Sequence, residues 1–236
     1  MVGGKGTRLR SVVADRPKPM AEIFGRPFLE WMLLALKLQG IKRVVLSVGH
    51  MAEYIQSFFG EGESLGIELV YALDPFPLGT GGALRNALRY LKTNTFVALN
   101  GDSYSSFNLN EMDVFHRQHN ASCTICLTHV VDKNRYGSIE LDSSDAVTLF
   151  QEKNSLDQSP GLINAGIYIF ERSFIEKIPA GIEISLEKDF FPEMIGRGLF
   201  AYKQEEGIFI DIGTPASYEA AGSILSGEFL RLDGLR

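Results

Sequence analysis

Apolar and polar segments alternate along the first hundred residues in a way that predicts helices and strands in turn. Phe28–Gly40 has a helical period that ends on glycine, and Arg43–Val48 is an apolar run typical of a buried strand. The order continues with a helix at Ala52–Phe59, a strand at Ile67–Ala72, a helix from about Gly82 to Leu91 and a strand at Thr95–Asn100. Strands and helices in such short succession favour an α/β fold, with a mixed, mainly parallel sheet flanked by helices. Ligands of such sheets bind at the carboxyl ends of the strands.

The second half of the chain has a different pattern. Strand-like runs separated by short polar turns occur at Ser122–Val131, Gly137–Leu141, Ala146–Glu152 and Leu162–Phe170. They predict antiparallel additions to the sheet. Helices are expected near Ile184–Met194 and Pro215–Leu225, around a last strand at Phe209–Ile212. Because no repeat or low-complexity linker interrupts the sequence, we expect a single domain over residues 1–236 with no appended module.

Composition and charge narrow the class of protein. The chain has 236 residues, of which 45% are hydrophobic and 22% charged, as in ordinary globular proteins. With 23 basic and 29 acidic residues its net charge is −6, so nucleic acid is not an expected partner. The most hydrophobic stretch, Phe28–Leu38, is far shorter than the ~20 residues that cross a bilayer. The chain opens on a glycine loop instead of a secretion leader, which favours a cytoplasmic protein without a membrane partner.

Cysteine and histidine spacings raise the question of a metal site. Cys123 and Cys126 have a C-x-x-C spacing, but they lie in the strand-like run Ala121–Val131, where side chains three apart point to opposite faces. No second pair completes a zinc site, and we interpret both cysteines as structural. His116 and His119 lie three apart on a predicted helix without a metal-site pattern, and we expect a solvated helix face.

Glycines cluster at the start of the chain, in the loop Gly3-Gly4-Lys5-Gly6-Thr7-Arg8-Leu9. Without β-carbons, several backbone N–H groups of such a loop can approach an anion closely. The loop contains a cation, Arg8, and Lys18 follows ten residues later between Pro17 and Pro19, which restrict its backbone. The sequence fits neither the P-loop nor the Rossmann glycine fingerprint. It predicts a phosphate site suited to a triphosphate.

This loop begins a series of motifs that closely resembles the sugar-1-phosphate nucleotidylyltransferases. Pro-Lys-Pro-Met follows from Pro17 and Pro-Leu-Gly-Thr-Gly-Gly-Ala from Pro77. The series continues with Asn100-Gly101-Asp102, Tyr136-Gly137, Glu152-Lys153, Asn164-Ala165-Gly166 and Asp211-Ile212-Gly213-Thr214-Pro215. Motifs in this order along nearly the whole chain are far more specific than any one of them. The resemblance implies a Rossmann-like nucleotide-diphospho-sugar transferase fold with an antiparallel sugar-binding elaboration. Residues 1–110 would mainly bind nucleotide and residues 111–236 mainly sugar phosphate.

The resemblance also implies a reaction and roles for residues. A sugar-1-phosphate oxygen attacks the α-phosphorus of a nucleoside triphosphate, and pyrophosphate leaves. Catalysis of this kind depends on positioning and charge neutralisation. Arg8 would hold the leaving pyrophosphate and Lys18 the reacting phosphates. Asp102 follows a predicted strand, where it could also be an ordinary turn residue, and in the family pattern it would share Mg²⁺ with Asp211.

Two further groups of residues receive roles from the resemblance. The nucleotide-binding group is Gly3, Gly4, Gly6, Thr7, Thr80, Gly81 and Gly82, and its second glycine cluster would let a base and ribose lie against the backbone. The sugar-phosphate group is Gly137, Glu152, Lys153 and Asn164, with Lys153 on the phosphate and the polar side chains on sugar hydroxyls.

Within the family, the pattern is most similar to guanylyltransferases that act on manno-configured sugars. GTP and D-glycero-α-D-manno-heptose 1-phosphate are the favoured substrates, with mannose 1-phosphate as the alternative. One departure is that only Met1 and Val2 precede the glycine loop, where similar proteins have a strand of about five residues. This central strand is therefore expected to be mostly missing, which puts stability and activity in question.

Other functions stay open from the sequence alone. A non-catalytic nucleotide-sugar-binding regulatory protein could keep the fold, although it would not need a pair of metal-binding carboxylates. A glycosyltransferase is less consistent, because Asp102 is followed by Ser103-Tyr104 and not by the second acid of an Asp-x-Asp motif. The oligomeric state, including a homo-oligomer, is also open.

Overall fold

The computed structural model describes residues 1–4, 9, 12–13, 15–133, 136, 138–151, 159–204 and 207–233. The chain divides into two compact units. The first unit comprises Met1–Pro77, Asn100–Tyr104 and Ile210–Arg236, and the second comprises Leu78–Leu99 and Ser105–Phe209. The single domain with a change of role near residue 110 stays a prediction.

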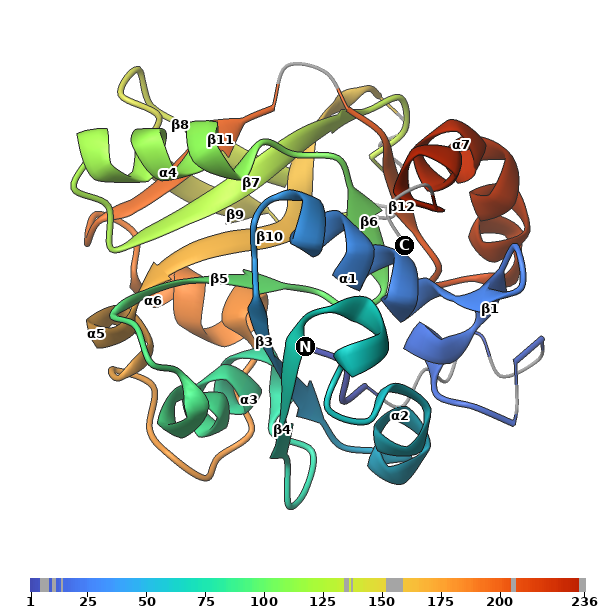
Figure 1. The fold of residues 1–236 in the computed structure, drawn as a ribbon. Coiled ribbons are helices and arrows are strands. Elements are labelled where there is room, and N and C mark those ends of the chain that lie inside the picture. Colours follow the sequence, from blue (N-terminus) through green and yellow to red (C-terminus); the bar gives the residue numbers. More distant parts are fainter. Residues whose placement is uncertain are drawn as a thin grey trace. The chain divides into compact units, whose positions relative to one another are not determined.

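The first unit contains a parallel strand pair, a short antiparallel hairpin and the helices α1, α2 and α7 (Figure 1). Its elements are β1 (Glu22–Ile23), β2 (Arg26–Pro27), α1 (Phe28–Leu38), β3 (Arg43–Val48), α2 (Ala52–Phe59), β4 (Glu68–Leu73) and α7 (Pro215–Asp233). Strands β3 and β4 are parallel, with Arg43 opposite Glu68 and Val48 opposite Leu73. The predicted helices and strands of this part are confirmed to within a residue or two, except that α7 continues well beyond Leu225.

Met1 and Val2 take a strand-like position beside β3. The Val2 backbone N–H donates to the Ser47 carbonyl at 2.9 Å, and the Gly101 N–H donates to the Met1 carbonyl at 2.8 Å. Val2 is only 3% exposed. A β-carbon on Gly101 would overlap Val2 Cγ1, so glycine is required for this close approach. The two residues thus provide backbone pairing where the central strand was expected to be mostly missing.

An aromatic contact fastens α7 to α1 within the first unit. The rings of Trp31 and Phe229 stack with centroids 4.2 Å apart and planes at 6°. The Trp31 indole N–H donates to the Ile23 carbonyl at 2.9 Å, which satisfies its polar group while the ring is buried. The α7 helix extends beyond the predicted end because Phe229 and Leu232 are buried residues of its last turns.

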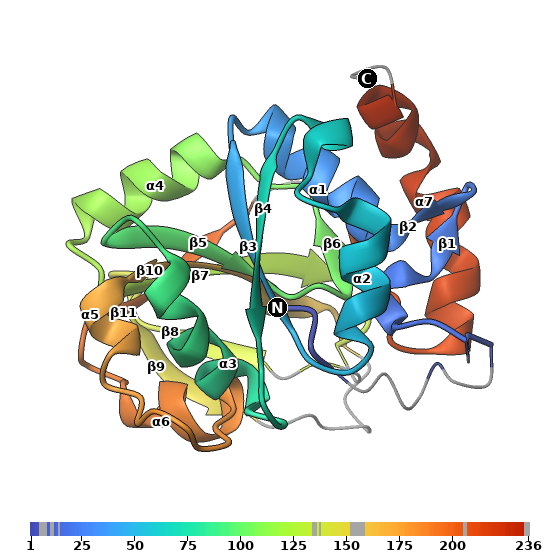
Figure 2. The same cartoon turned by 60° about the horizontal axis from the view of Figure 1, so that its bottom comes forward.

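The second unit is built on a six-stranded sheet (Figure 2). Its elements are α3 (Gly79–Ala87), β5 (Thr95–Leu99), α4 (Leu109–Gln118), β7 (Cys123–Val130), β8 (Ser138–Leu141), β9 (Val147–Gln151), β10 (Gly161–Glu171), α5 (Arg172–Ile175), α6 (Phe191–Glu193) and β11 (Leu199–Lys203). The strand order is β11-β7-β10-β8-β9, and β5 pairs with β10. Helix α4 packs against β7, and α6 packs against β9.

The α/β class with mixed sheets is confirmed, but parallel pairs do not predominate among the described strands. Strand β10 is antiparallel to β5, β7 and β8, and β8 is antiparallel to β9. Among the described residues of the six-stranded sheet, only β7 and β11 form a parallel pair. The predicted antiparallel additions are confirmed, because short connections such as the turn between β8 and β9 reverse the chain. Two short strands, β6 (Ser103–Ser105) and β12 (Phe209–Asp211), pair with each other.

Both cysteines belong to the interior of β7. Cys123 and Cys126 are free thiols with no exposed surface. Burial raises the pKa of the Cys126 thiol to about 12 and that of Cys123 well above its usual value, so neither is a ready thiolate. Among the described residues, no helix is both long and apolar enough to cross a membrane.

The expected solvated helix face is wrong for His116. The side chain of His116 is buried, because it lies four residues after the buried Met112 on the face of α4 that meets the sheet. Its Nδ1 lies 2.8 Å from Thr124 Oγ1 and its Nε2 lies 3.4 Å from Glu171 Oε1. His119 is half-buried and stacks on Phe115.

The buried His116 is expected to make the fold sensitive to acid. Burial lowers the pKa of His116, and the neighbouring Glu171 opposes this only in part. Below the ordinary value of about 6.5 the unfolded chain therefore binds more protons than the folded chain. The free energy of unfolding should then fall as the pH falls from about 6.5 through the lowered pKa.

Urea midpoints at pH 7 and pH 5 measure this effect. His116→Gln is expected to lose less stability on acidification than the wild type. His119→Gln, at the C-cap of the same helix and half-exposed, serves as the control and should keep the wild-type loss. The same loss in His116→Gln as in the wild type would contradict this account.

Candidate active site

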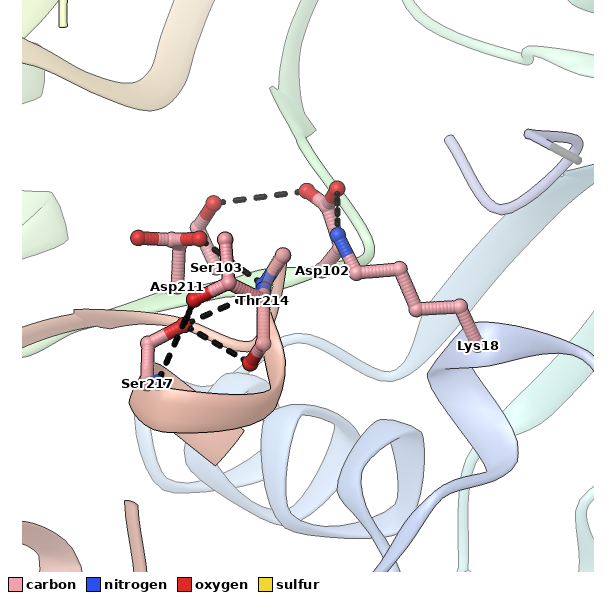
Figure 3. Close-up of polar contacts among 7 residues, drawn as sticks. Lys18, Asp102, Ser103, Asp211, Thr214 and Ser217 are labelled. Carbon is pink, nitrogen blue, oxygen red and sulfur yellow. Dashed lines mark hydrogen bonds and ion pairs between the residues drawn. The ribbon is translucent and has the colours of Figure 1, made fainter. Parts of the chain in front are cut away.

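Lys18 and Asp102 form an ion pair in the first unit (Figure 3). Lys18 Nζ donates to Asp102 Oδ2 at 2.6 Å, and the Lys18 side chain is 10% exposed while that of Asp102 is 43% exposed. Lys18 lies on a single 3₁₀ turn, Lys18–Met20, between Pro17 and the buried Pro19. The prolines fix the backbone on both sides, as the sequence predicts, and the buried Met20 anchors the turn.

Asp102 lies in the short loop between β5 and Ser103, and two hydrogen bonds fix its position. Its backbone carbonyl accepts from the Ile212 N–H at 2.9 Å, and the Ser103 hydroxyl donates to its Oδ1 at 3.3 Å. Lys18 and Ser103 thus contact different oxygens of the Asp102 carboxylate, as Figure 3 shows. The backbone contact ties the loop of Asp102 to the segment that carries Asp211.

Asp211 lies at the end of β12, next to the same lysine. Its Oδ1 accepts from the Gly213 N–H at 2.8 Å, and a β-carbon on Gly213 would lie 3.4 Å from Lys18 Nζ. The following turn is closed by Thr214 and Ser217, whose hydroxyl oxygens are 2.9 Å apart at the start of α7. Tertiary structure therefore brings Lys18, Asp102 and Asp211 together from three distant parts of the sequence.

The two aspartates can be tested as a site for Mg²⁺. Within the described part of the chain, no group of three or more His, Cys, Asp or Glu side chains could hold a metal ion by itself. A pair of carboxylates nevertheless fits this ion, which is usually bound by one or two carboxylates, with waters and substrate phosphates as its other ligands. Asp102 and Asp211 offer hard oxygen donors of this kind, and both side chains are partly exposed.

Gly3, Gly4 and the buried Leu9 are the described residues of the first glycine loop. A β-carbon on Gly3 would lie 3.3 Å from Asp74 Oδ2 and 3.4 Å from the Gly49 nitrogen. The start of the loop therefore lies at the carboxyl ends of β3 and β4, the expected ligand edge of parallel strands. The predicted site residues Gly6, Thr7 and Arg8 lie outside the described residues.

The second glycine cluster packs against residues 182–184. In the second unit, β-carbons on Gly79 and Gly82 would overlap the carbonyl oxygens of Ile184 and Ile182. The Gly81 N–H donates to the Ile184 carbonyl at 2.8 Å. Gly79 also has a φ of +67°, which favours glycine. The β-carbon positions of Gly79 and Gly82 are thus filled by the protein's own backbone. The role of Thr80, Gly81 and Gly82 in nucleotide binding stays a prediction.

Thr80 and Asn164 belong to one hydrogen-bond network in the second unit. Thr80 Oγ1 donates to Glu187 Oε2 at 3.0 Å, and Tyr168 OH donates to Glu187 Oε1 at 3.0 Å. Asn164 Nδ2 donates to Tyr168 OH at 2.9 Å. The other predicted sugar-phosphate residues, Gly137, Glu152 and Lys153, lie outside the described residues.

Sequence reasoning missed Asp74 and Glu187. Asp74 follows β4 directly, the same signal that singled out Asp102 after β5, and its Oδ2 accepts from the Ser47 hydroxyl at 3.0 Å. Glu187 belongs to a π-helical turn, Leu186–Phe190, and no local pattern distinguishes it from the exposed acids around it. Only its tertiary contacts do.

Comparison with known proteins shows to which family the chain belongs. Residues 1–226 match the sequence profile of the family described as Nucleotidyl transferase. The chain is 37% identical over 221 residues to a mannose-1-phosphate guanylyltransferase of Mycobacterium tuberculosis, covering 92% of this chain and 61% of that protein. It is 36% identical over 223 residues to a D-glycero-alpha-D-manno-heptose 1-phosphate guanylyltransferase of Campylobacter jejuni, covering 92% of this chain and 95% of that protein.

The fold is similar to the crystal structure of HddC from Yersinia pseudotuberculosis, with a TM-score of 0.83 and 35% identity. The similarity covers 94% of this chain and 96% of HddC, which has also been crystallised in complex with GMP-PN. Fold and sequence together define an α/β nucleotidyl transferase. The chain belongs to this family, and the resemblance to its sugar-1-phosphate nucleotidyltransferases is confirmed. It spans 61% of the length of the mycobacterial relative.

Gly→Ala substitutions in the second glycine cluster and in α7 are expected to change the free energy of unfolding in opposite directions. Gly82→Ala should destabilise the protein by about 1–3 kcal/mol, because the new β-carbon meets the backbone of Ile182. Gly227→Ala in α7, where no atom lies within 4 Å of the new β-carbon, should stabilise by about 0.5–1 kcal/mol through helix propensity. Urea unfolding compares them. If Gly82→Ala were as stable as Gly227→Ala, residues 182–184 would not pack on the cluster.

Proposed function

We propose that this protein transfers GMP from GTP to a sugar 1-phosphate, with D-glycero-α-D-manno-heptose 1-phosphate favoured and mannose 1-phosphate as the alternative. A phosphate oxygen of the sugar 1-phosphate forms a bond to the α-phosphorus of GTP. The bond from that phosphorus to the oxygen bridging to the β-phosphate breaks, and pyrophosphate leaves. The convergence of Lys18 on Asp102, beside Asp211, in a chain of this family carries the proposal.

The proposed roles follow from charge. Two phosphorylated substrates bring several negative charges together, and fixed cations lower the barrier by stabilising the charge that develops in the transition state. Lys18 is held between two prolines and would place its ammonium group at the reacting phosphate. Arg8 is proposed to hold the leaving pyrophosphate. Asp102 and Asp211 are proposed to hold Mg²⁺, which when bound would neutralise phosphate oxygens.

GTP as the nucleotide is supported by Asp74 as well as by the guanylyltransferase relatives. A carboxylate accepts hydrogen bonds, and the edge of guanine offers two adjacent donors, N1–H and the N2 amino group. The corresponding edges of uracil and adenine each combine donors with acceptors, which a carboxylate would repel. Asp74 lies beside Gly3 at the carboxyl end of β4, so we propose that it reads the base.

The identity of the sugar is proposed from the sequence pattern. The relatives named for mannose and for heptose are about equally similar to this chain, at 37% and 36% identity. The heptose is favoured by the overall resemblance of the sequence pattern to the D-glycero-α-D-manno-heptose 1-phosphate guanylyltransferases. We propose that Gly137, Glu152, Lys153 and Asn164 bind the sugar phosphate. Location in the cytoplasm and assembly into a homo-oligomer stay predictions.

A matrix of substrates tests the activity. The purified protein with Mg²⁺ is expected to release pyrophosphate with GTP and either heptose or mannose 1-phosphate, and more slowly with the other four nucleoside triphosphates. The assay follows pyrophosphate release for each pair. Omission of Mg²⁺ should abolish the signal, and so should omission of the sugar phosphate. No release with any pair would favour a non-catalytic binding protein instead.

Substitution of the metal-binding candidates tests the site. Asp102→Ala and Asp211→Ala are each expected to lower turnover by about 10²-fold or more. Without either carboxylate, Mg²⁺ would be held less well, and the negative charge at the transferred phosphate would no longer be offset. Asp113→Ala, on the surface of α4 and paired with Arg117, is the matched control and should keep wild-type turnover. A wild-type rate in Asp102→Ala would remove this residue from the site.

Base selection is tested with Asp74→Asn. An amide donates as well as accepts, so the preference for GTP over UTP should fall by about tenfold, the loss of one hydrogen bond. The ratio of kcat/KM for the two nucleotides is the measurement. An unchanged ratio would show that Asp74 does not contact the base.

A further inference from the structure

In the second unit, a continuous series of hydrogen bonds joins Thr80, in the second glycine cluster, to Asn164, a predicted sugar-phosphate residue. From one end, Thr80 Oγ1 donates to Glu187 Oε2, as does Ser185 Oγ at 3.1 Å. From the other end, Asn164 Nδ2 donates to Tyr168 OH, which donates to Glu187 Oε1. Glu187 contacts Thr80 directly and reaches Asn164 through Tyr168, and it belongs to neither motif.

Backbone N–H groups set the direction of the hydrogen bonds at both ends of this series. The Gly166 N–H donates to Asn164 at 2.9 Å, so the oxygen of that amide must face Gly166 and its nitrogen must face Tyr168. The Leu186 N–H donates to Thr80 Oγ1 at 2.8 Å, so the Thr80 hydroxyl proton is left to point at Glu187. Glu187 therefore accepts in all its contacts, which an ionised carboxylate does with four lone-pair sites.

The middle of the chain is rigid. Tyr168 has no exposed surface, and its ring stacks on Phe170 with centroids 5.4 Å apart. Burial, helped by the charge of Glu187, raises the pKa of Tyr168 well above its usual value, so the phenol keeps its proton and acts as a donor. Thr80, Asn164 and Glu187 are partly exposed at the two ends.

We propose that Glu187 is a positioning residue that, through Tyr168, fixes which polar atoms Asn164 presents to the sugar. This inference rests on the proposed function. With one Nδ2 hydrogen and the Oδ1 bond to Gly166 accounted for, Asn164 retains one N–H donor and one oxygen lone pair. A sugar hydroxyl both accepts and donates and matches this pair. Glu187 then contributes to the choice between sugars without touching them.

Glu187→Gln tests this because it keeps the shape of the side chain and changes only its polarity. If the new amide nitrogen faced Thr80 and Ser185, the hydroxyl protons of both residues would lose their acceptor. If it faced Tyr168, only the Tyr168 proton would lose its acceptor, so this orientation is favoured. The amide nitrogen then donates to Tyr168 OH in competition with Asn164, and the Asn164 side chain is released. Tyr168→Phe removes the same connection from the other side, and Glu183→Gln, exposed on the same segment, is the matched control.

Steady-state kinetics on the full chain measure the effect. Glu187→Gln and Tyr168→Phe are each expected to raise the KM for the sugar 1-phosphate about tenfold, with a smaller change in kcat and in the KM for GTP. Discrimination between mannose 1-phosphate and glucose 1-phosphate, which differ at one hydroxyl, should fall by a similar factor. The double variant should be no worse than either single one, because both break one chain. A loss of folded protein would lower kcat alone.

A second measurement does not depend on turnover. In ¹⁵N-labelled protein, the side-chain amide signal of Asn164, assigned with Asn164→Asp, should shift in Glu187→Gln and stay in place in Glu183→Gln. The contrary result is that Glu187→Gln and Tyr168→Phe match Glu183→Gln in the KM for the sugar 1-phosphate, in the discrimination between the two sugars and in the Asn164 signal. That result overturns the inference while the proposed function stands. If the wild type itself shows no turnover, the proposed function fails, and the Asn164 signal still decides whether Glu187 sets its orientation.

Discussion

Both units depend on places where two backbones approach more closely than a β-carbon allows. In the first unit, Gly101 lies against Met1 and Val2, and Gly3 lies against Gly49. In the second, Gly79 and Gly82 lie against residues 182–184. These contacts place the polar residues that come next in sequence, because Asp102 follows Gly101 and Thr80 stands between two of the glycines. Glycine therefore acts here by permitting the packing that positions the site.

The charge of Lys18 is met by a partner inside the candidate site. The Lys18 ammonium is largely buried and its charge is met by Asp102 at 2.6 Å, a short charge-assisted hydrogen bond. A buried ammonium without a partner would be costly. The same two groups are those proposed to meet a phosphate and a metal ion, whose charges are also opposite. Binding of both ligands would therefore exchange one balanced set of contacts for another, at little cost in unpaired charge.

Regular elements with a clear period were predictable, and short or context-dependent ones were not. The limits of Arg43–Val48 and Ala52–Phe59 agree with the sequence prediction, because both combine a distinct pattern with glycine or a polar residue at the boundary. Strand β11 was missed because five residues show too little alternation. His116 was misplaced because its partners, Thr124 and Glu171, come from strands that are distant in sequence.

The sequence by itself determined the family, the order of most elements and the candidates Lys18, Asp102 and Asp211, since ordered motifs and strand ends are local signals. Tertiary structure alone decided that these three side chains meet, that the second glycine cluster packs on residues 182–184, and that Glu187 connects Thr80 with Asn164. The reason is physical. A pattern along the chain records which backbone conformation each segment favours, whereas a hydrogen bond between residues a hundred positions apart exists only once the strands that carry them are packed.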